Sequence, residues 1–74
     1  MGNIDAVENL VIPEDLLFAF RQNTKAFDNY NNFSPSYRKS YLYWLNQAKR
    51  QETRVARILE IIKFCERNIK SRVN

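Results

Sequence analysis

The sequence predicts an all-α fold, a compact bundle of three to four helices in which the last two are the longest. Three observations support this prediction. Apolar residues recur every three or four positions, as on one face of a helix, and no stretch alternates apolar and polar residues as a strand does. One glycine and two prolines are too few for a fold rich in hairpins. The 74 residues are 45% hydrophobic, which is typical of one small globular domain.

The first helix is predicted over about residues 13 to 22. Pro13 opens it, because proline needs no amide partner at the first helical position. Glu14 and Asp15 follow, and carboxylates suit the positive end of the helix dipole. The apolar residues of its face are Leu16, Leu17 and Phe20. Residues 1 to 11, before it, show no periodicity and are predicted to form a flexible arm.

A short second helix is predicted over about residues 24 to 31. Asn23 and Thr24 mark a break in the pattern and supply a new N-cap. Phe27 and Tyr30 then fall on its apolar face.

The third helix is predicted from residue 35 to about residue 49. Ser34 and Pro35 give its start, a capping hydroxyl followed by proline at the first helical position. Its apolar stripe, expected in the core, consists of Tyr37, Tyr41, Trp44, Leu45 and Ala48.

The fourth helix is predicted over about residues 52 to 69. Its main apolar line consists of Val55, Ile58, Leu59, Ile62, Cys65 and Ile69. Ile61 and Phe64 widen that line, which indicates a central helix that contacts several partners. The helical domain is therefore expected over residues 12 to 70, with a tail at 71 to 74.

The composition excludes several kinds of site. Without histidine and with Cys65 as the single cysteine, the chain has no ordinary zinc site, no histidine-based triad and no internal disulfide. We therefore expect no cofactor, no metal and no catalysis. No apolar run approaches the roughly 20 residues that cross a bilayer, and no secretory signal is visible. These features predict a cytoplasmic protein.

Charge is divided unevenly along the chain. Residues 1 to 33 hold two cations and five carboxylates, a net charge of −3, whereas residues 34 to 74 hold ten cations and three carboxylates, a net charge of +7. An anionic partner should therefore meet the second half.

The cations are densest in AKRQETRVARI, residues 48 to 58. We take six residues as candidates for binding an anion or a partner: Arg38, Tyr43, Lys49, Arg50, Arg54 and Arg57. Arginine offers a planar fork to anions, and Tyr43 lies among cations on the polar face of its helix, where it suits a nucleobase or a protein contact. The alternative is a solvated junction whose cations complement the negative end of the third helix. Glu52 and Thr53 are expected to brace that junction, Glu52 by pairing with a nearby cation (Arg38, Lys49 or Arg54) and Thr53 by capping.

The whole pattern resembles the YdeI/OmpD-associated family, the OmdA domain, which is named for bacteriocin protection. The residues that carry the resemblance are Pro13 to Leu16, Phe27, Ser34 to Ser36, Arg38, Tyr41, Trp44, Ala48, Lys49, Glu52 to Arg54, Arg57 and Ile58. Gln51 stands where members of that family commonly have proline, so the start of the fourth helix is less sharply set. The resemblance implies a compact helical domain linked to bacterial envelope stress or to resistance against antibacterial peptides.

Two functions follow from these observations. The first is a non-catalytic protein-interaction module whose basic half meets an acidic protein or an envelope-associated component. The alternative is a helical domain that binds nucleic acid through the same basic half.

Overall fold

The structure, a computed structural model, describes residues 10–69, which form four helices and no strand. The helices are α2 (Glu14–Arg21), α3 (Thr24–Asn32), α4 (Pro35–Asn46) and α5 (Gln51–Glu66). The all-α prediction is confirmed, and the last two helices are the longest. Most of the predicted N-terminal arm and the predicted C-terminal tail lie outside the described residues.

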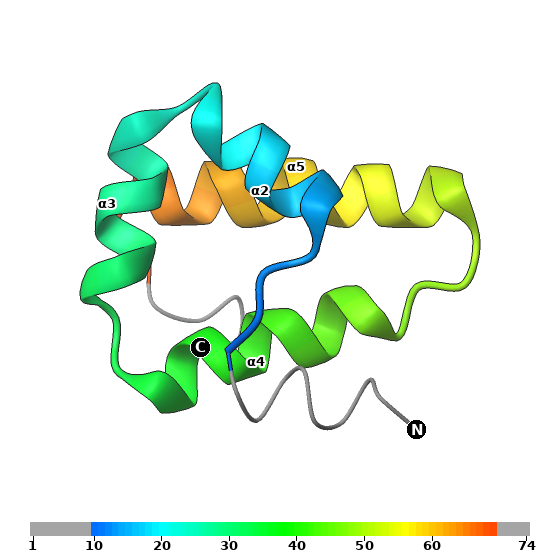
Figure 1. The fold of residues 1–74 in the computed structure, drawn as a ribbon, viewed down its shortest axis with the longest axis horizontal. Helices are drawn as coiled ribbons and strands as arrows, with labels where there is room; N and C mark the ends of the chain where they lie inside the picture. The colour runs from blue at the N-terminus through cyan, green and yellow to red at the C-terminus, as the bar shows by residue number, and fades with distance from the viewer. Residues whose placement is uncertain (1–9, 70–74) are drawn as a thin grey trace.

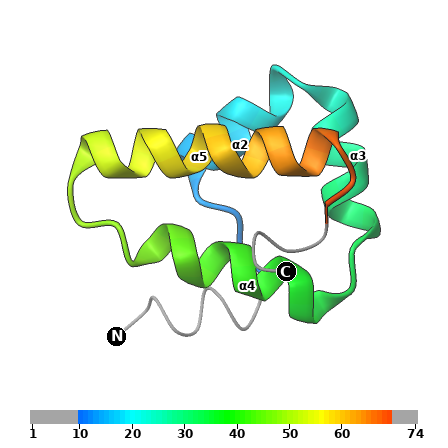
Figure 2. The same cartoon turned by 180° about the vertical axis from the view of Figure 1, so that it is seen from behind.

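α5 is the central helix of the domain. It packs against α2, α3 and α4, and α2 also packs against α3 (Figure 1). Seen from behind, α5 runs along α4, and the two are joined by a short loop at one end (Figure 2). The largest fully buried side chains come from all four helices: Leu16, Phe20, Tyr30, Tyr41, Leu42, Leu45, Ile61 and Cys65.

Aromatic rings fill the region between α2 and α3. The ring of Phe20 lies 5.1 Å from that of Phe27 and 4.9 Å from that of Tyr30, centroid to centroid. Such offset and tilted ring pairs stabilise a core beyond the area that they bury. The predicted burial of Tyr30 is confirmed, while Phe27 is partly buried against the core.

The starts of the helices follow the sequence signals with differences of one residue. Pro13 is the N-cap of α2 and not its first helical residue. Asn23 caps α3 as predicted, since its side-chain oxygen accepts a hydrogen bond of 3.2 Å from the amide of Ala26. Pro35 begins α4 as predicted, but the hydroxyl of Ser34 makes no capping hydrogen bond.

Both long helices end earlier than the periodicity predicts. α4 stops at Asn46 and not near residue 49, in a tight turn where the amide of Ala48 bonds to the carbonyl of Leu45 at 3.0 Å. α5 stops at Glu66 and not at residue 69. Asn68 adopts a left-handed backbone with a φ of 62°, and the amide of Ile69 reaches back to the carbonyl of Phe64 at 2.8 Å. This is a Schellman end with asparagine in the position that glycine most often takes.

The buried faces of the long helices differ from the predicted stripes. On α5 the buried residues are Ile58, Ile61 and Cys65, while Val55 and Leu59 are exposed. On α4 the buried residues include Leu42, which the prediction omitted, whereas Tyr37 is exposed. Each predicted stripe therefore includes residues that are exposed, because the neighbouring helices cover a different part of the apolar face of the helix.

Candidate functional site

The predicted cationic cluster lies where α4 ends and α5 begins. Residues 47–50 form the short link between the two helices, and Arg50 is the N-cap of α5 in an extended backbone conformation. Lys49 and Arg50 are exposed there. We call four of the six candidate residues the junction surface, because they lie on the link or within two helical turns of it: Tyr43, Lys49, Arg50 and Arg57.

Arg57 joins the end of α4 to α5. Its Nη1 donates a hydrogen bond of 2.7 Å to the carbonyl of Trp44, one of the last carbonyls of α4, where the regular hydrogen bonds of the helix run out. Its guanidinium carbon also lies 5.0 Å from the centre of the Trp44 ring, within cation–π range. A cation at this position complements the negative end of α4. Arg57 is therefore held in one orientation at the junction.

Arg54 points away from the junction surface and towards α2. Its Nε and Nη2 donate to the two carboxylate oxygens of Asp15 at 2.8 Å and 3.0 Å, a two-point ion pair. The hydrogen bonds from Arg54 hold the pKa of Asp15 below its usual value, and the carboxylate raises the pKa of Arg54 in turn. This pair fixes α2 against the start of α5. The guanidinium of Arg54 thus serves to join two helices of the domain.

Arg38 is also separated from the junction surface. Leu42 and Leu45, which are buried, lie four and seven residues after Arg38 and so on the same side of α4. The Nε of Arg38 is buried and has no hydrogen-bond acceptor among residues 10–69. The hydroxyl of Tyr30 is buried without a partner there as well, and burial raises the pKa of that phenol although the charge of Arg38 opposes the shift.

Tyr43 and the side chains around it form a shallow polar groove along α4. The groove encloses about 470 Å³ and is lined by Ser36, Lys39, Ser40, Tyr43, Trp44 and Gln47. Tyr43 is 42% exposed, as expected for the polar face of the helix. Trp44 lines this groove, and its ring also contacts the guanidinium of Arg57. The groove is therefore next to the junction surface.

Glu52 and Thr53 brace the junction less than expected. Within residues 10–69 Glu52 pairs with Arg50, at 4.0 Å, and not with one of the three expected cations, and both side chains are 82% exposed. Exposed pairs of this kind contribute little to stability. Thr53 lies inside the first turn of α5 and not at its cap, because the helix already begins at Gln51. In the first half of α5 the side-chain contacts to other helices come instead from Arg54 and Arg57.

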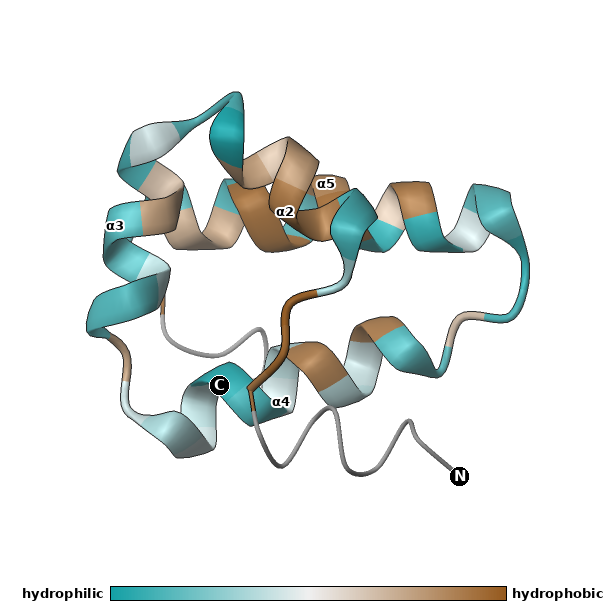
Figure 3. Ribbon diagram, viewed as in Figure 1, coloured by the Kyte–Doolittle hydropathy of each residue, from teal (hydrophilic) through white to brown (hydrophobic). Residues whose placement is uncertain are grey.

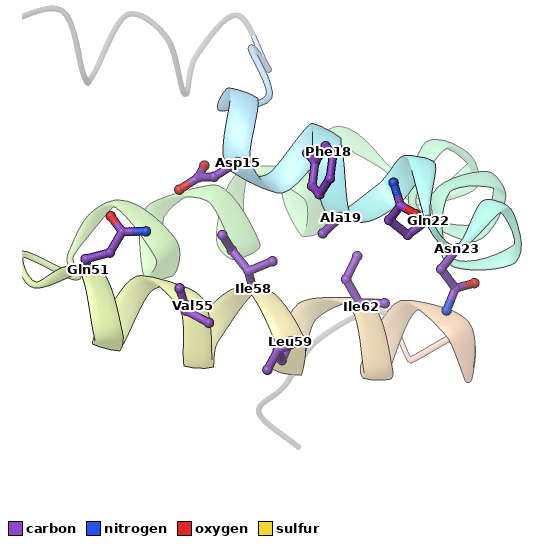
Figure 4. A pocket seen from close by; sticks show the side chains of 10 residues that line it. All are labelled: Asp15, Phe18, Ala19, Gln22, Asn23, Gln51, Val55, Ile58, Leu59 and Ile62. Atoms are coloured by element: carbon purple, nitrogen blue, oxygen red, sulfur yellow. The ribbon is translucent and has the colours of Figure 1, made fainter.

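An apolar groove lies on the other side of α5, between α5 and α2, and the sequence prediction missed it. It encloses about 530 Å³; Ala19, Ile58 and Ile62 line it, together with three strongly exposed apolar residues. These are Phe18, 66% exposed, Leu59, 63% exposed, and Val55, 45% exposed. Asp15 and Gln51 lie at one end and Gln22 and Asn23 at the other (Figure 4). Hydrophobic residues of α2 and α5 gather where these helices meet (Figure 3). The signal in the sequence was Phe18, an aromatic residue outside the predicted stripe of its helix.

The comparisons with known proteins give the family. The family model described as "OmdA: Bacteriocin-protection, YdeI or OmpD-Associated" matches residues 9–68. This chain belongs to the OmdA family. No curated protein and no solved structure matches it. The match covers all four helices of the OmdA domain, and the resemblance inferred from the sequence is confirmed.

Several residues that carried the family resemblance form the contacts between helices in this OmdA domain. Asp15 and Arg54 join α2 to α5, and Trp44 and Arg57 join α4 to α5. Arg54 and Arg57 of the sequence AKRQETRVARI therefore have a structural role here. No described helix is long and apolar enough to cross a membrane. Within residues 10–69 no group of three His, Cys, Asp or Glu side chains is placed to hold a metal.

Proposed function

We propose that this OmdA domain is a non-catalytic interaction module that binds an acidic protein through its junction surface. In this proposal the domain works in the cytoplasm, in a response to envelope stress or to antibacterial peptides. The words "bacteriocin-protection" in the family description support the link to antibacterial peptides. Its basic charge and exposed aromatic residue supply the binding.

The observation that carries the proposal is the fixed position of Arg57. A guanidinium has five N–H groups, and one of those on Arg57 bonds to the carbonyl of Trp44. The guanidinium also lies over the face of the Trp44 ring. Because Arg57 is already held in place, it loses little conformational entropy when it binds an acceptor on a partner. Arginine, tryptophan and tyrosine are the residues in which binding energy concentrates at protein interfaces. Trp44, Arg57 and Tyr43 bring these three types together.

The charge around Arg57 also favours an acidic partner. Lys49 and Arg50 are exposed in the link between α4 and α5, about two helical turns before Arg57. The carboxylate nearest to Arg50 is that of Glu52, at the outer limit of an ion pair. The charges of these cations are therefore only weakly compensated within the domain, and they can attract an acidic surface.

The binding test is an amide NMR titration with a glutamate-rich peptide, at low and at physiological salt. We expect the amide signals of the junction surface and the indole signal of Trp44 to shift. The charge reversal K49E/R50E should weaken binding by about tenfold, or 1.4 kcal/mol. R21E/K25E is the matched control, because it changes two exposed cations by the same total charge on α2 and α3. Equal weakening by both pairs would show a general charge effect and would contradict the proposal.

Nucleic acid is the second candidate, and the position of Tyr43 favours it. This half-exposed ring shares the polar groove with Lys39, an arrangement that allows a base to stack beside a phosphate contact. The same titration with a short mixed-sequence duplex tests it. Salt-dependent shifts at Tyr43 and at residues 49–57 with the duplex, and none with the peptide, would show that the partner is nucleic acid and not an acidic protein.

A further inference from the structure

The outward face of α5 carries an apolar stripe between two opposite charges. Val55, Leu59 and Ile62 follow one another at intervals of four and three residues, on the side of α5 that borders the apolar groove. Glu52 lies near the start of this stripe and Lys63 near its end, and both are exposed. The stripe therefore has a carboxylate, Glu52, near its N-terminal end and a cation, Lys63, beside Ile62, while Glu66 continues the stripe beyond Lys63.

The stripe is complementary to the same stripe on a second copy of α5 that runs in the opposite direction. The midpoint between Glu52 and Lys63 and the midpoint between Val55 and Ile62 differ by one residue, about 1.5 Å along a helix. When two copies of α5 lie antiparallel with these midpoints together, Glu52 of each copy faces Lys63 of the other. In the same register Val55 meets Ile62, and the two Leu59 side chains lie close to the centre. A two-fold interface requires this kind of self-matching.

We propose that two copies of this chain associate through antiparallel α5 helices, with Leu59 of each copy placed in the apolar groove of the other. Ala19 of α2, a small residue, and Ile62 of α5 line that groove and leave room for an aliphatic side chain (Figure 4). Phe18 stands beside it, two-thirds exposed, and is covered in the dimer. Two ion pairs between Glu52 and Lys63 set the direction of the helices.

The charges favour a second copy over another apolar partner. An unrelated amphipathic helix would need a basic group at one end and an acidic group at the other, whereas α5 already provides both at the matching spacing. Exposed ion pairs contribute more to orientation than to affinity. The contact is built mainly from one helix and one side chain of α2, so it falls in the class of small, reversible interfaces. The dimer should therefore depend on concentration.

The test is sedimentation equilibrium of the full chain from about 10 μM to about 1 mM, the range that suits a weak complex. We expect the average mass to rise from the 8.9 kDa of one chain towards twice that value. L59E should abolish the rise. E52K and K63E should each weaken association about tenfold, because each places like charges opposite one another in both ion pairs. Circular dichroism checks that each variant keeps its helices.

The decisive arm is an equimolar mixture of the two charge variants. In a mixed dimer the position changed in E52K faces the position changed in K63E, and the two unchanged positions face each other. Both pairs then join opposite charges again, so association should return to the level of the native chain. D28K and K25E, at exposed positions of α3, make the same charge changes outside the proposed interface and should behave as the native chain, singly and mixed.

Two results would overturn the proposal. One is a native chain that stays at 8.9 kDa up to the highest concentration. The other is a mixture of E52K and K63E that associates no better than either variant alone.

Discussion

The ion pair between Asp15 and Arg54 gives the sharpest test of how this domain is held together. It joins α2 to the first turn of α5 across 39 positions of sequence, by two hydrogen bonds of 2.8 Å and 3.0 Å. The perturbations are D15N, R54Q and the double variant. Asparagine keeps one oxygen, which can still accept the hydrogen bond of 2.9 Å that the amide of Leu16 donates to Asp15, but it removes the charge and replaces one acceptor of Arg54 by an NH2 donor.

The expected effect lies between that of a surface pair and that of a buried pair. Two unit charges 4 Å apart attract by about 4 kcal/mol at the effective dielectric of a protein surface. The side chains of Arg54 and Asp15 are 22% and 34% exposed, so screening, desolvation and lost rotamer freedom offset most of that energy. We expect a coupling of about 1 to 2 kcal/mol, helped by the two-point geometry. In a domain of this size, a loss of that free energy lowers the melting temperature by about 5 to 15 °C.

The pH dependence of stability provides a second readout of the same pair. The pKa of Asp15 is lowered in the folded state, chiefly by the hydrogen bonds from Arg54. The pair therefore contributes fully above the ordinary carboxyl pKa, near 4, and its contribution is lost as the pH falls through the lower folded-state value. Native and D15N stabilities should differ at pH 7 and converge towards pH 2.

Urea and thermal unfolding, followed by circular dichroism at 222 nm, measure both effects. Two results would refute the reasoning. One is a double variant whose loss of stability equals the sum of the two single losses, which means no coupling. The other is a difference between native and D15N stability that does not change between pH 7 and pH 2.

Two further predictions concern the interior and a helix start. Cys65 is fully buried and burial raises the pKa of its thiol to about 12, so we expect it to react with a thiol reagent at pH 8 at least about 100-fold more slowly in the native protein than in urea. Reaction at the unfolded rate in native buffer would show that Cys65 is accessible. Asn23 caps α3 through the amide of Ala26, so N23A should lower the free energy of unfolding by about 1 kcal/mol, while N23D should retain most of it. Equal losses in N23A and N23D, measured by urea unfolding, would show that the cap does not matter.

The starts of the helices were predictable because their signals are local. Asn23 accepts from an amide within one turn of its own position, and Pro35 has a fixed backbone angle and no N–H that needs a partner, and the structure begins α3 and α4 there. The ends of α2 and α3 were predicted to within one residue, but those of α4 and α5 were not, since apolar periodicity continues past them. At the end of α5 the decisive residue is Asn68, whose left-handed backbone closes the helix. Asparagine tolerates that conformation better than most residues, and it was the one local signal available.

The orientation of α5 needed more than periodicity. Its apolar residues cover an arc wide enough to face several neighbours, and sequence spacing alone does not say which part of the arc meets the core. Packing against the other three helices buries Ile61 and Cys65 and leaves Leu59 outside. The apolar groove follows from this rotation, which explains why it was missed.

The candidate site shows that sequence spacing also fails to predict which partners the charged residues take. The count of cations near residues 48 to 58 was correct, but the partners of Arg54 and Arg57 come from other helices. A carboxylate 39 positions away and a carbonyl at the end of α4 are visible only after folding. The cationic surface is therefore smaller than the sequence indicates. Lys49 and Arg50 remain its most exposed members, and Arg57 is its most fixed one.

The two proposed surfaces are separated by the geometry of α5 itself. Arg57 and Leu59 are two residues apart, which places them about 200° apart around a helix. Arg57 accordingly contacts α4, and Leu59 borders the apolar groove shared with α2. A dimer formed through Leu59 would leave both junction surfaces open, one on each copy, so a partner with repeated acidic segments would be bound at two points. L59E therefore tests the dimer separately, whereas R50E also changes the ion-pair partner of Glu52, so K49E is the change that acts on the junction surface alone.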